Sequence, residues 1–161
     1  MDPNVRPSVV SDVAAYKLQL DSLIDLAHLV KVSKEDLEWL DPGRSIDQHA
    51  AALLARSNCE LVVVTLGDEG SRAFTASGTA KAGIYAPPVF GDTVGAGDSL
   101  MAGIITILSE TGDLKPGRLK QLDQPALEKM LRFGAVVAGL NCGQKGCKPP
   151  TRGEVDAVLA T

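Results

Sequence analysis

The segment from residue 91 to 99 has the residue types and spacing that could bind and transfer a phosphoryl group. It reads Gly-Asp-Thr-Val-Gly-Ala-Gly-Asp-Ser, and an apolar stretch with helical periodicity follows it. Gly95 and Gly97, separated by Ala96, let the backbone fold into a concavity of N–H groups. The positive end of the following helix adds to that field, so the turn suits a phosphoryl oxygen.

Asp98 lies in the same turn and needs its own explanation, because a carboxylate repels a bound phosphate. One explanation is a general base, which would accept the proton of an attacking hydroxyl while the backbone amides neutralise the transferring group. The alternative is structural, with Asp98 capping the helix and the glycines making only a tight turn. Two other phosphate motifs are excluded: the segment lacks the third glycine of the dinucleotide fingerprint, and no Gly-Lys-Ser/Thr occurs in the chain.

Composition and charge limit the partners of the chain. Its 161 residues carry a net charge of −4, which speaks against nucleic acid as a partner. No apolar run reaches the roughly 20 residues of a membrane helix, and no basic segment followed by an apolar one opens the sequence. Cys142 and Cys147 lack a second cysteine or histidine pair that would complete a zinc site, so we expect reduced thiols. These features predict a cytoplasmic protein that binds neither nucleic acid nor a membrane.

Strands and helices are expected to alternate along the chain. Residues 61–66 are apolar on both faces, as in a central strand of a covered parallel sheet, and Ser77-Gly78 predicts a hairpin. This alternation predicts an α/β fold with a mostly parallel sheet in a single domain, residues 1–161. Strands are expected at 29–32, 61–66, 72–76 and 80–85, and helices at 13–27, 34–40, 46–58, 98–109, 127–138 and from 151 onward.

Several segments together resemble a known enzyme family. Residues 92–99, with Met-Ala-Gly at 101–103, look like the second signature of ribokinase-like (pfkB-type) carbohydrate kinases. Residues 65–70 resemble the nucleotide-binding turn of that family, and residues 2–7 and 30–40 are most similar to fructokinase-like members. The resemblance covers essentially the whole chain but only the later, C-terminal half of the family's length.

The resemblance implies a three-layer, Rossmann-like fold in which helices flank a mostly parallel sheet. It implies that Asp98 is the catalytic base and that the amides of residues 95–97 form the anion hole. Thr65, Gly67 and Gly70 would line the nucleotide. The implied reaction is ATP-dependent transfer of a phosphoryl group to a sugar hydroxyl.

The resemblance also implies contacts to ions and phosphate. Ser33 and Asp36 fall where relatives have an Asn-x-x-Glu motif that influences Mg²⁺ and phosphate placement, although Ser-x-x-Asp is equally a capping arrangement for the next helix. Asp92 and residues 143–147 lie where many relatives hold a monovalent cation such as K⁺. Lys31 either approaches a phosphate or is a solvated charge at the end of a strand.

The first half of the family, which supplies most sugar contacts and a lid, is expected to be missing from this chain. Its early Gly-Gly-Asn/Asp signature does not occur in the sequence. A kinase without a sugar site loses the rate advantage of a positioned hydroxyl. Two functions therefore stay open: a sugar kinase that is active when the missing half is supplied, and a non-catalytic nucleotide-binding remnant. An exposed sheet edge also predicts self-association or a partner that covers the edge.

Overall fold

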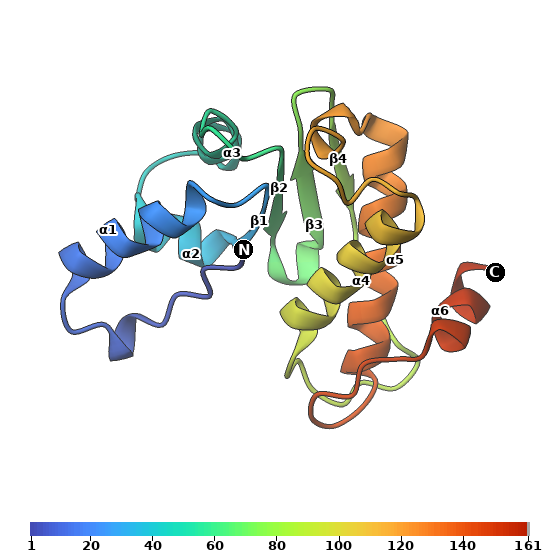
Figure 1. Ribbon diagram of the computed structural model, residues 1–161. Coiled ribbons are helices and arrows are strands. Elements are labelled where there is room, and N and C mark those ends of the chain that lie inside the picture. Colours follow the sequence, from blue (N-terminus) through green and yellow to red (C-terminus); the bar gives the residue numbers. More distant parts are fainter. Residues whose placement is uncertain (161) are drawn as a thin grey trace.

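A four-stranded sheet forms the centre of the molecule (Figure 1). The computed structural model describes residues 1–160, so Thr161, the last residue of the expected domain, lies outside the described residues. The order of the strands in the sheet follows the chain. The strands are β1 (Leu29–Ser33), β2 (Leu61–Thr65), β3 (Ser71–Phe74) and β4 (Thr79–Ala82).

The sheet is mixed, which corrects the expectation of a mostly parallel one. β1 and β2 are parallel, whereas β2–β3 and β3–β4 are antiparallel. The connections explain these directions, because one 3-10 turn, η2 (Gly67–Glu69), joins β2 to β3, and residues 75–78 join β3 to β4. Such short loops reverse the chain, whereas a parallel pair needs a long crossover. The α/β class and the hairpin around Ser77-Gly78 are confirmed.

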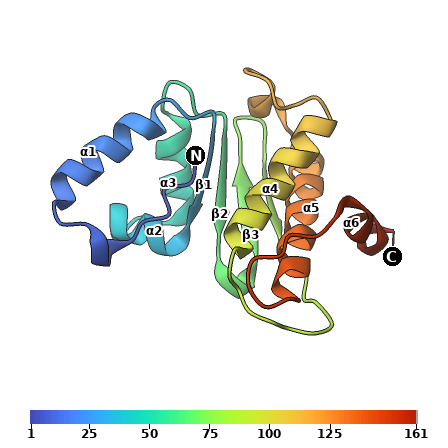
Figure 2. The same cartoon turned by 60° about the horizontal axis from the view of Figure 1, so that its bottom comes forward.

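Helices cover both faces of the sheet, which gives the expected three layers (Figures 1 and 2). Those on one face are α1 (Val13–Ile24), α2 (Lys34–Leu40) and α3 (Ile46–Leu54). Those on the other are α4 (Ala96–Glu110) and α5 (Gln124–Cys142), with α6 (Arg152–Leu159) packed on α5. Two further 3-10 turns are η1 (Pro7–Val9) and η3 (Leu119–Gln121). Every helix predicted from the sequence is therefore present, with its ends shifted by a few residues.

The side chains of the central strands alternate between the two helical layers. In β1, Leu29 joins the core beneath α4 and α5, whereas Val30 and Val32 join the core beneath α1–α3. Because successive side chains of a strand point to opposite faces, Lys31 faces the α4–α5 layer. A lysine thus enters the layer that carries the predicted phosphate turn.

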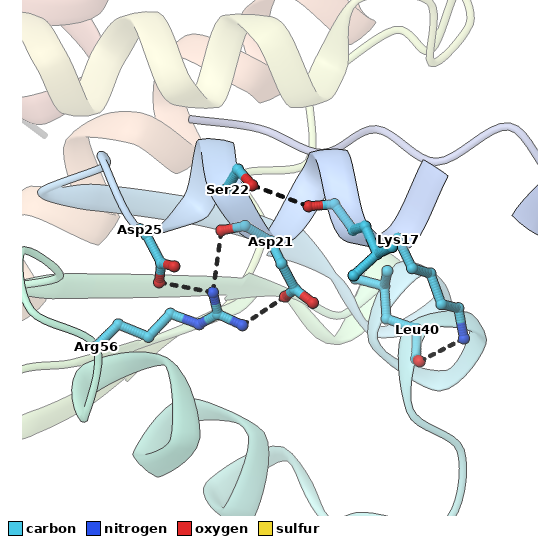
Figure 3. A network of polar contacts seen from close by, with 7 residues as sticks. Lys17, Asp21, Ser22, Asp25, Leu40 and Arg56 are labelled. Carbon is cyan, nitrogen blue, oxygen red and sulfur yellow. Dashed lines mark hydrogen bonds and ion pairs between the residues drawn. The ribbon is translucent and has the colours of Figure 1, made fainter. Parts of the chain in front are cut away.

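Polar contacts hold the α1–α3 layer together (Figure 3). Arg56, just after α3, donates to the carboxylate of Asp21 at 2.5 Å and to that of Asp25 at 2.8 Å, both at the end of α1. Lys17 of α1 donates to the main-chain oxygen of Leu40 at 2.7 Å, where α2 ends. These contacts cross-link the three helices, and exposed ion pairs contribute about 0.2–1 kcal/mol each.

The first residue pairs with part of the free edge of β1. The Met1 ammonium donates to the main-chain oxygen of Leu29 at 2.8 Å, and the Lys31 N–H donates to the main-chain oxygen of Met1 at 2.9 Å. The edge that we expected to be exposed is therefore covered at this point, and β4 is the edge strand on the other side. No helix within residues 1–160 has the length and apolar character needed to cross a membrane.

Candidate active site

The first turn of α4 leaves backbone donors free. Its N-cap residue Gly95 has a φ of 74°, in the left-handed region that favours glycine, and no side chain caps the helix. The Ala96 N–H donates to the main-chain oxygen of Thr93 at 3.1 Å, so this amide is used within the turn. The N–H groups of Gly95, Gly97 and Asp98 have no acceptor among residues 1–160. These donors lie at the positive end of a helix, where free backbone N–H groups are available to an anion.

Two polar side chains hold this turn in place. Asp92 accepts the Val94 N–H at 2.9 Å through one carboxylate oxygen and the Gly146 N–H at 2.8 Å through the other. Asn141, fully buried in α5, donates to the main-chain oxygen of Val94 at 2.8 Å and accepts the Lys148 N–H at 2.8 Å. The amides of Gly146 and Val94 lower the pKa of Asp92. Both side chains therefore fasten the turn to the loop that follows α5.

That loop lies directly against the turn. A Cβ added to Gly95 would be 2.5 Å from Cys147 Sγ, so glycine is required here by the contact as well as by the backbone conformation. Cys147 is exposed, and its thiol is free. The loop of residues 143–147 thus closes one side of the α4 N-terminus.

Asp98 is the acidic residue of the first turn of α4, and it is exposed. Its carboxylate has no hydrogen-bond or ion-pair partner in the described part of the chain. The capping alternative for Asp98 is therefore wrong, because its side chain binds no backbone amide. An unpaired carboxylate beside free backbone amides has the position that a general base needs in order to accept the proton of a hydroxyl.

A cavity of about 690 Å³ opens beside the turn. Its volume lies within the range of about 300–1,000 Å³ that is usual for small-molecule sites. Thr65, Gly67 and Gly70, which we predicted to line a nucleotide, all contribute to its wall, together with Ala96 and Gly97. Much of the remaining wall is apolar, with contributions from Ile84, Tyr85, Pro87, Phe90, Leu100, Ala135 and Ala138. The cavity therefore connects the predicted nucleotide turn with the predicted phosphate turn.

The Ser33–Asp36 pair serves the fold. Ser33 caps α2 by accepting the Asp36 N–H at 3.0 Å, and the buried Asp36 carboxylate accepts the Val5 N–H at 3.0 Å. Glu35, and not Asp36, contributes to the cavity wall. Asp36 and Asp92, the expected metal ligands, each bind backbone amides, and no three His, Cys, Asp or Glu side chains within residues 1–160 gather into a metal site.

Lys31 reaches the phosphate turn. The residue is only 7% exposed, and its Nζ atom lies 2.9 Å from the position that a Cβ on Gly97 would take. Nζ also donates to Asp2 Oδ2 at 2.9 Å. The interpretation of Lys31 as a solvated charge is therefore wrong, because the ammonium is buried beside α4.

The fold and the site have counterparts among known proteins. Residues 1–152 match the pfkB family carbohydrate kinases, and the chain belongs to that family. It is similar to fructokinase-2 of Solanum lycopersicum, with 32% identity over 98% of this chain and 47% of that protein. The chain spans about half the length of the curated relatives it matches.

Two solved structures define the shared fold. A fructokinase of Vibrio cholerae O395, solved with fructose, ADP and a calcium ion, is 28% identical, with a TM-score of 0.78 over 98% of this chain and 49% of that one. A fructokinase of Xylella fastidiosa with bound ATP has a TM-score of 0.84 at 21% identity, over 99% of this chain and 50% of that one. The expected ribokinase-like, partial fold is confirmed.

Three residues of the site were given no role from the sequence: Asn141, Glu35 and Asp2. Asn141 ends an apolar helical stripe, and a single polar residue in such a place is a signal for a buried hydrogen bond. Glu35 is one position from Asp36, about 100° around a helix, and the Ser-x-x-Asp spacing favoured its neighbour. Asp2 and Lys31 are 29 residues apart, and no spacing rule links residues so distant.

Proposed function

We propose that this chain is the nucleotide-binding and phosphoryl-transfer half of an ATP-dependent sugar kinase. The observation that carries the proposal is the first turn of α4, where three free amides lie beside the unpaired carboxylate of Asp98. Membership of the pfkB family carbohydrate kinases supports the reaction class. The relative that was solved with fructose and ADP favours a ketohexose as the acceptor.

Asp98 is the general base in this proposal. Its carboxylate accepts the proton of a sugar hydroxyl while the hydroxyl oxygen forms a bond to the γ-phosphorus of ATP. The bond from that phosphorus to the bridging oxygen breaks, and ADP leaves with the electron pair. The amides of Gly95, Gly97 and Asp98 donate to the oxygens of the transferring group and stabilise their charge. The amide of Ala96 supports the turn through Thr93.

The cavity beside the turn is the proposed ATP site. Thr65, Gly67 and Gly70 lie in its wall close to the end of β2, and its apolar remainder suits the face of a purine base. Lys31, beside Gly97, is proposed to contact the phosphates, because an ammonium at that place adds positive charge to the anion site.

Mg²⁺ enters the proposal together with the ATP phosphates, since this ion is commonly held by one or two carboxylates plus phosphate oxygens. Glu35 fits that role better than Asp36, because Glu35 lies in the cavity wall and the Asp36 carboxylate binds the Val5 N–H. K⁺ beside Asp92 and residues 143–147 stays a prediction.

The sugar site is proposed to come from protein outside residues 1–160, because the chain spans about half the length of its relatives. That half, a second copy or a partner would also cover the rest of the β1 edge. We place the reaction in the cytoplasm, where three free thiols stay reduced. The same half-length favours a second candidate function, a nucleotide-binding remnant without turnover.

Release of ADP from ATP, Mg²⁺ and fructose tests the proposal, both for the chain alone and for the chain fused behind the missing half of a fructokinase. Asp98→Asn is expected to lower turnover by about 10²–10⁴-fold, the usual contribution of a positioned base. Glu38→Gln is the control, because it also removes an exposed, unpaired acid, on α2. Turnover that survives Asp98→Asn would contradict the base assignment.

Calorimetry with ATP and Mg²⁺ separates the two candidate functions. ATP binding without turnover in either form of the protein supports the remnant. A chain that binds no ATP contradicts both functions, because each of them needs the nucleotide site.

A further inference from the structure

The ammonium of Lys31 has an unusual environment. It is buried, and its only hydrogen-bond or ion-pair partner within residues 1–160 is Asp2, whose Oδ2 lies 2.9 Å from Nζ. An ammonium has three N–H donors, so two of them lack a protein acceptor. Nζ lies against Gly97, next to the free amides of the α4 turn.

This arrangement is electrostatically costly unless anions are present. A helix N-terminus carries partial positive charge, and a buried cation beside it adds to that charge instead of compensating it. Burial of a charged group also costs free energy unless the group is paired and hydrogen-bonded. Asp2 supplies one compensating charge, and a phosphoryl group bound to the turn would supply the second.

The backbone holds Asp2 in place independently of its side chain. Met1 forms two main-chain hydrogen bonds to the edge of β1, one on each side of Val30. Asp2 follows Met1 along the same edge, so its carboxylate lies beside Lys31, the strand residue that follows Val30. Its second oxygen, Oδ1, is buried without a partner, so the Asp2 carboxylate is committed to Lys31 alone.

We infer that Asp2 is a positioning residue, which holds the Lys31 ammonium against the first turn of α4 so that the ammonium and the free amides bind one phosphoryl group together. The inference deepens the proposed function and rests on it. Asp2 itself does not contact the phosphate, which its negative charge would repel. Its effect on anion binding therefore exists only through Lys31.

A double-mutant cycle on ATP affinity tests this dependence, with calorimetry on the chain of residues 1–161. Lys31→Met is expected to weaken ATP binding by about 10–100-fold, the usual size of one charge-assisted contact. Asp2→Asn is expected to weaken binding by about 3–10-fold, because the ammonium loses its fixed position. In the Lys31→Met background, Asp2→Asn is expected to tighten binding, because it then removes only a repelling charge.

Two further variants show whether a loss of affinity reflects the position of the carboxylate or a general loss of folding. Asp2→Glu keeps the carboxylate and is expected to restore affinity to within about threefold of the original chain. Asp21→Asn is the matched control, because it removes an aspartate of an ion pair, with Arg56, in the opposite layer. Its ATP affinity is expected to equal that of the original chain.

The outcomes separate the inference from the proposed function. If Asp2→Asn changes the affinity by the same factor in both backgrounds, Asp2 acts independently of Lys31 and the inference is overturned. If Asp2→Asn does not fold, failure of Asp2→Glu to bind ATP like the original chain overturns it instead. If the original chain binds no ATP, the proposed function fails, and the inference fails with it.

Discussion

The first turns of α2 and α4 differ in how their backbone N–H groups are used. In α2, Ser33 accepts a hydrogen bond from the Asp36 N–H, and the Asp36 carboxylate accepts one from the Val5 N–H. In α4, neither Gly95 nor Asp98 caps a backbone N–H. The other α-helices resemble α2, because each has a side-chain cap: Asp12, Ser45, Asp123 or Thr151. A missing cap costs a helix about 0.5–2 kcal/mol. The other α-helices of residues 1–160 thus have side-chain caps, and only α4, whose amides we propose to bind phosphate, begins without one.

Asp92 and Asp98, the two acids of the 92–98 segment, also differ in whether their carboxylates are hydrogen-bonded. Asp92 uses both oxygens on backbone amides, which lower its pKa, and it fixes the shape of the turn. Asp98 uses neither oxygen within the described residues. One acid is therefore structural, and the other is available for chemistry.

Disrupting the uncapped first turn of α4 is expected to have the largest effect. Substitutions of Gly95 and Gly112 by alanine provide a controlled test. Gly95 and Gly112 have φ values of 74° and 76°, so alanine is strained by about 1–2 kcal/mol at each. A Cβ on Gly112 meets nothing within 4 Å, whereas a Cβ on Gly95 meets Cys147. Both variants should lose stability in urea unfolding, but Gly95→Ala alone should also weaken ATP binding, by at least about tenfold, since its turn must shift. Equal affinities for the two variants would show that the turn does not bind the phosphates.

The turn at the start of α4 was predictable because its determinants are local. Gly95 and Gly97, followed by an apolar stretch of helical period, predict a tight turn at the start of a helix, whereas the absence of a side-chain cap is seen only in the structure. Thr65, Gly67 and Gly70 were assigned through the resemblance of residues 65–70 to a family turn, and all three lie in the wall of the cavity. Local patterns predicted nearly every element, because periodicity and turn residues act over a few positions.

Features that depend on distant parts of the chain were missed or mistaken. The sheet is mixed because tight turns follow β2 and β3, and a buried strand has the same composition beside parallel and antiparallel neighbours. Asp36 was expected at a metal from its place in a local motif, and the contact of its Oδ1 atom with the N–H of Val5, 31 residues away, was missed. Lys31 was left undecided because its surroundings come from Asp2 and Gly97, which only the folded sheet brings together.

The structural role of Asp92 is expected to appear in the pH dependence of stability. Its pKa is lowered from 3.8 in the folded state by the amides of Gly146 and Val94. The ionised form therefore stabilises the fold fully above the ordinary value, and this contribution is lost as the pH falls through the lowered pKa. Thermal melts from pH 7 to pH 3 should show a shallower acid loss for Asp92→Asn than for the original chain. Asp98→Asn is the comparison, because the Asp98 carboxylate has no hydrogen-bond or ion-pair partner within residues 1–160. A shallower acid loss in Asp98→Asn alone would contradict the assignment.

The smallest expected effect tests whether Ser33 serves only as the N-cap of α2. Ser33→Ala removes the cap on the Asp36 N–H and should cost about 1 kcal/mol in urea unfolding. Ser45→Ala, at the capping box of α3, is the matched control and should cost a similar amount. ATP affinity should stay unchanged in both, because neither serine belongs to the cavity wall. If Ser33→Ala alone weakened ATP binding, Ser33 would be a nucleotide contact, as its place in the family motif implied. The N-terminus of α2 would then take part in nucleotide binding like that of α4.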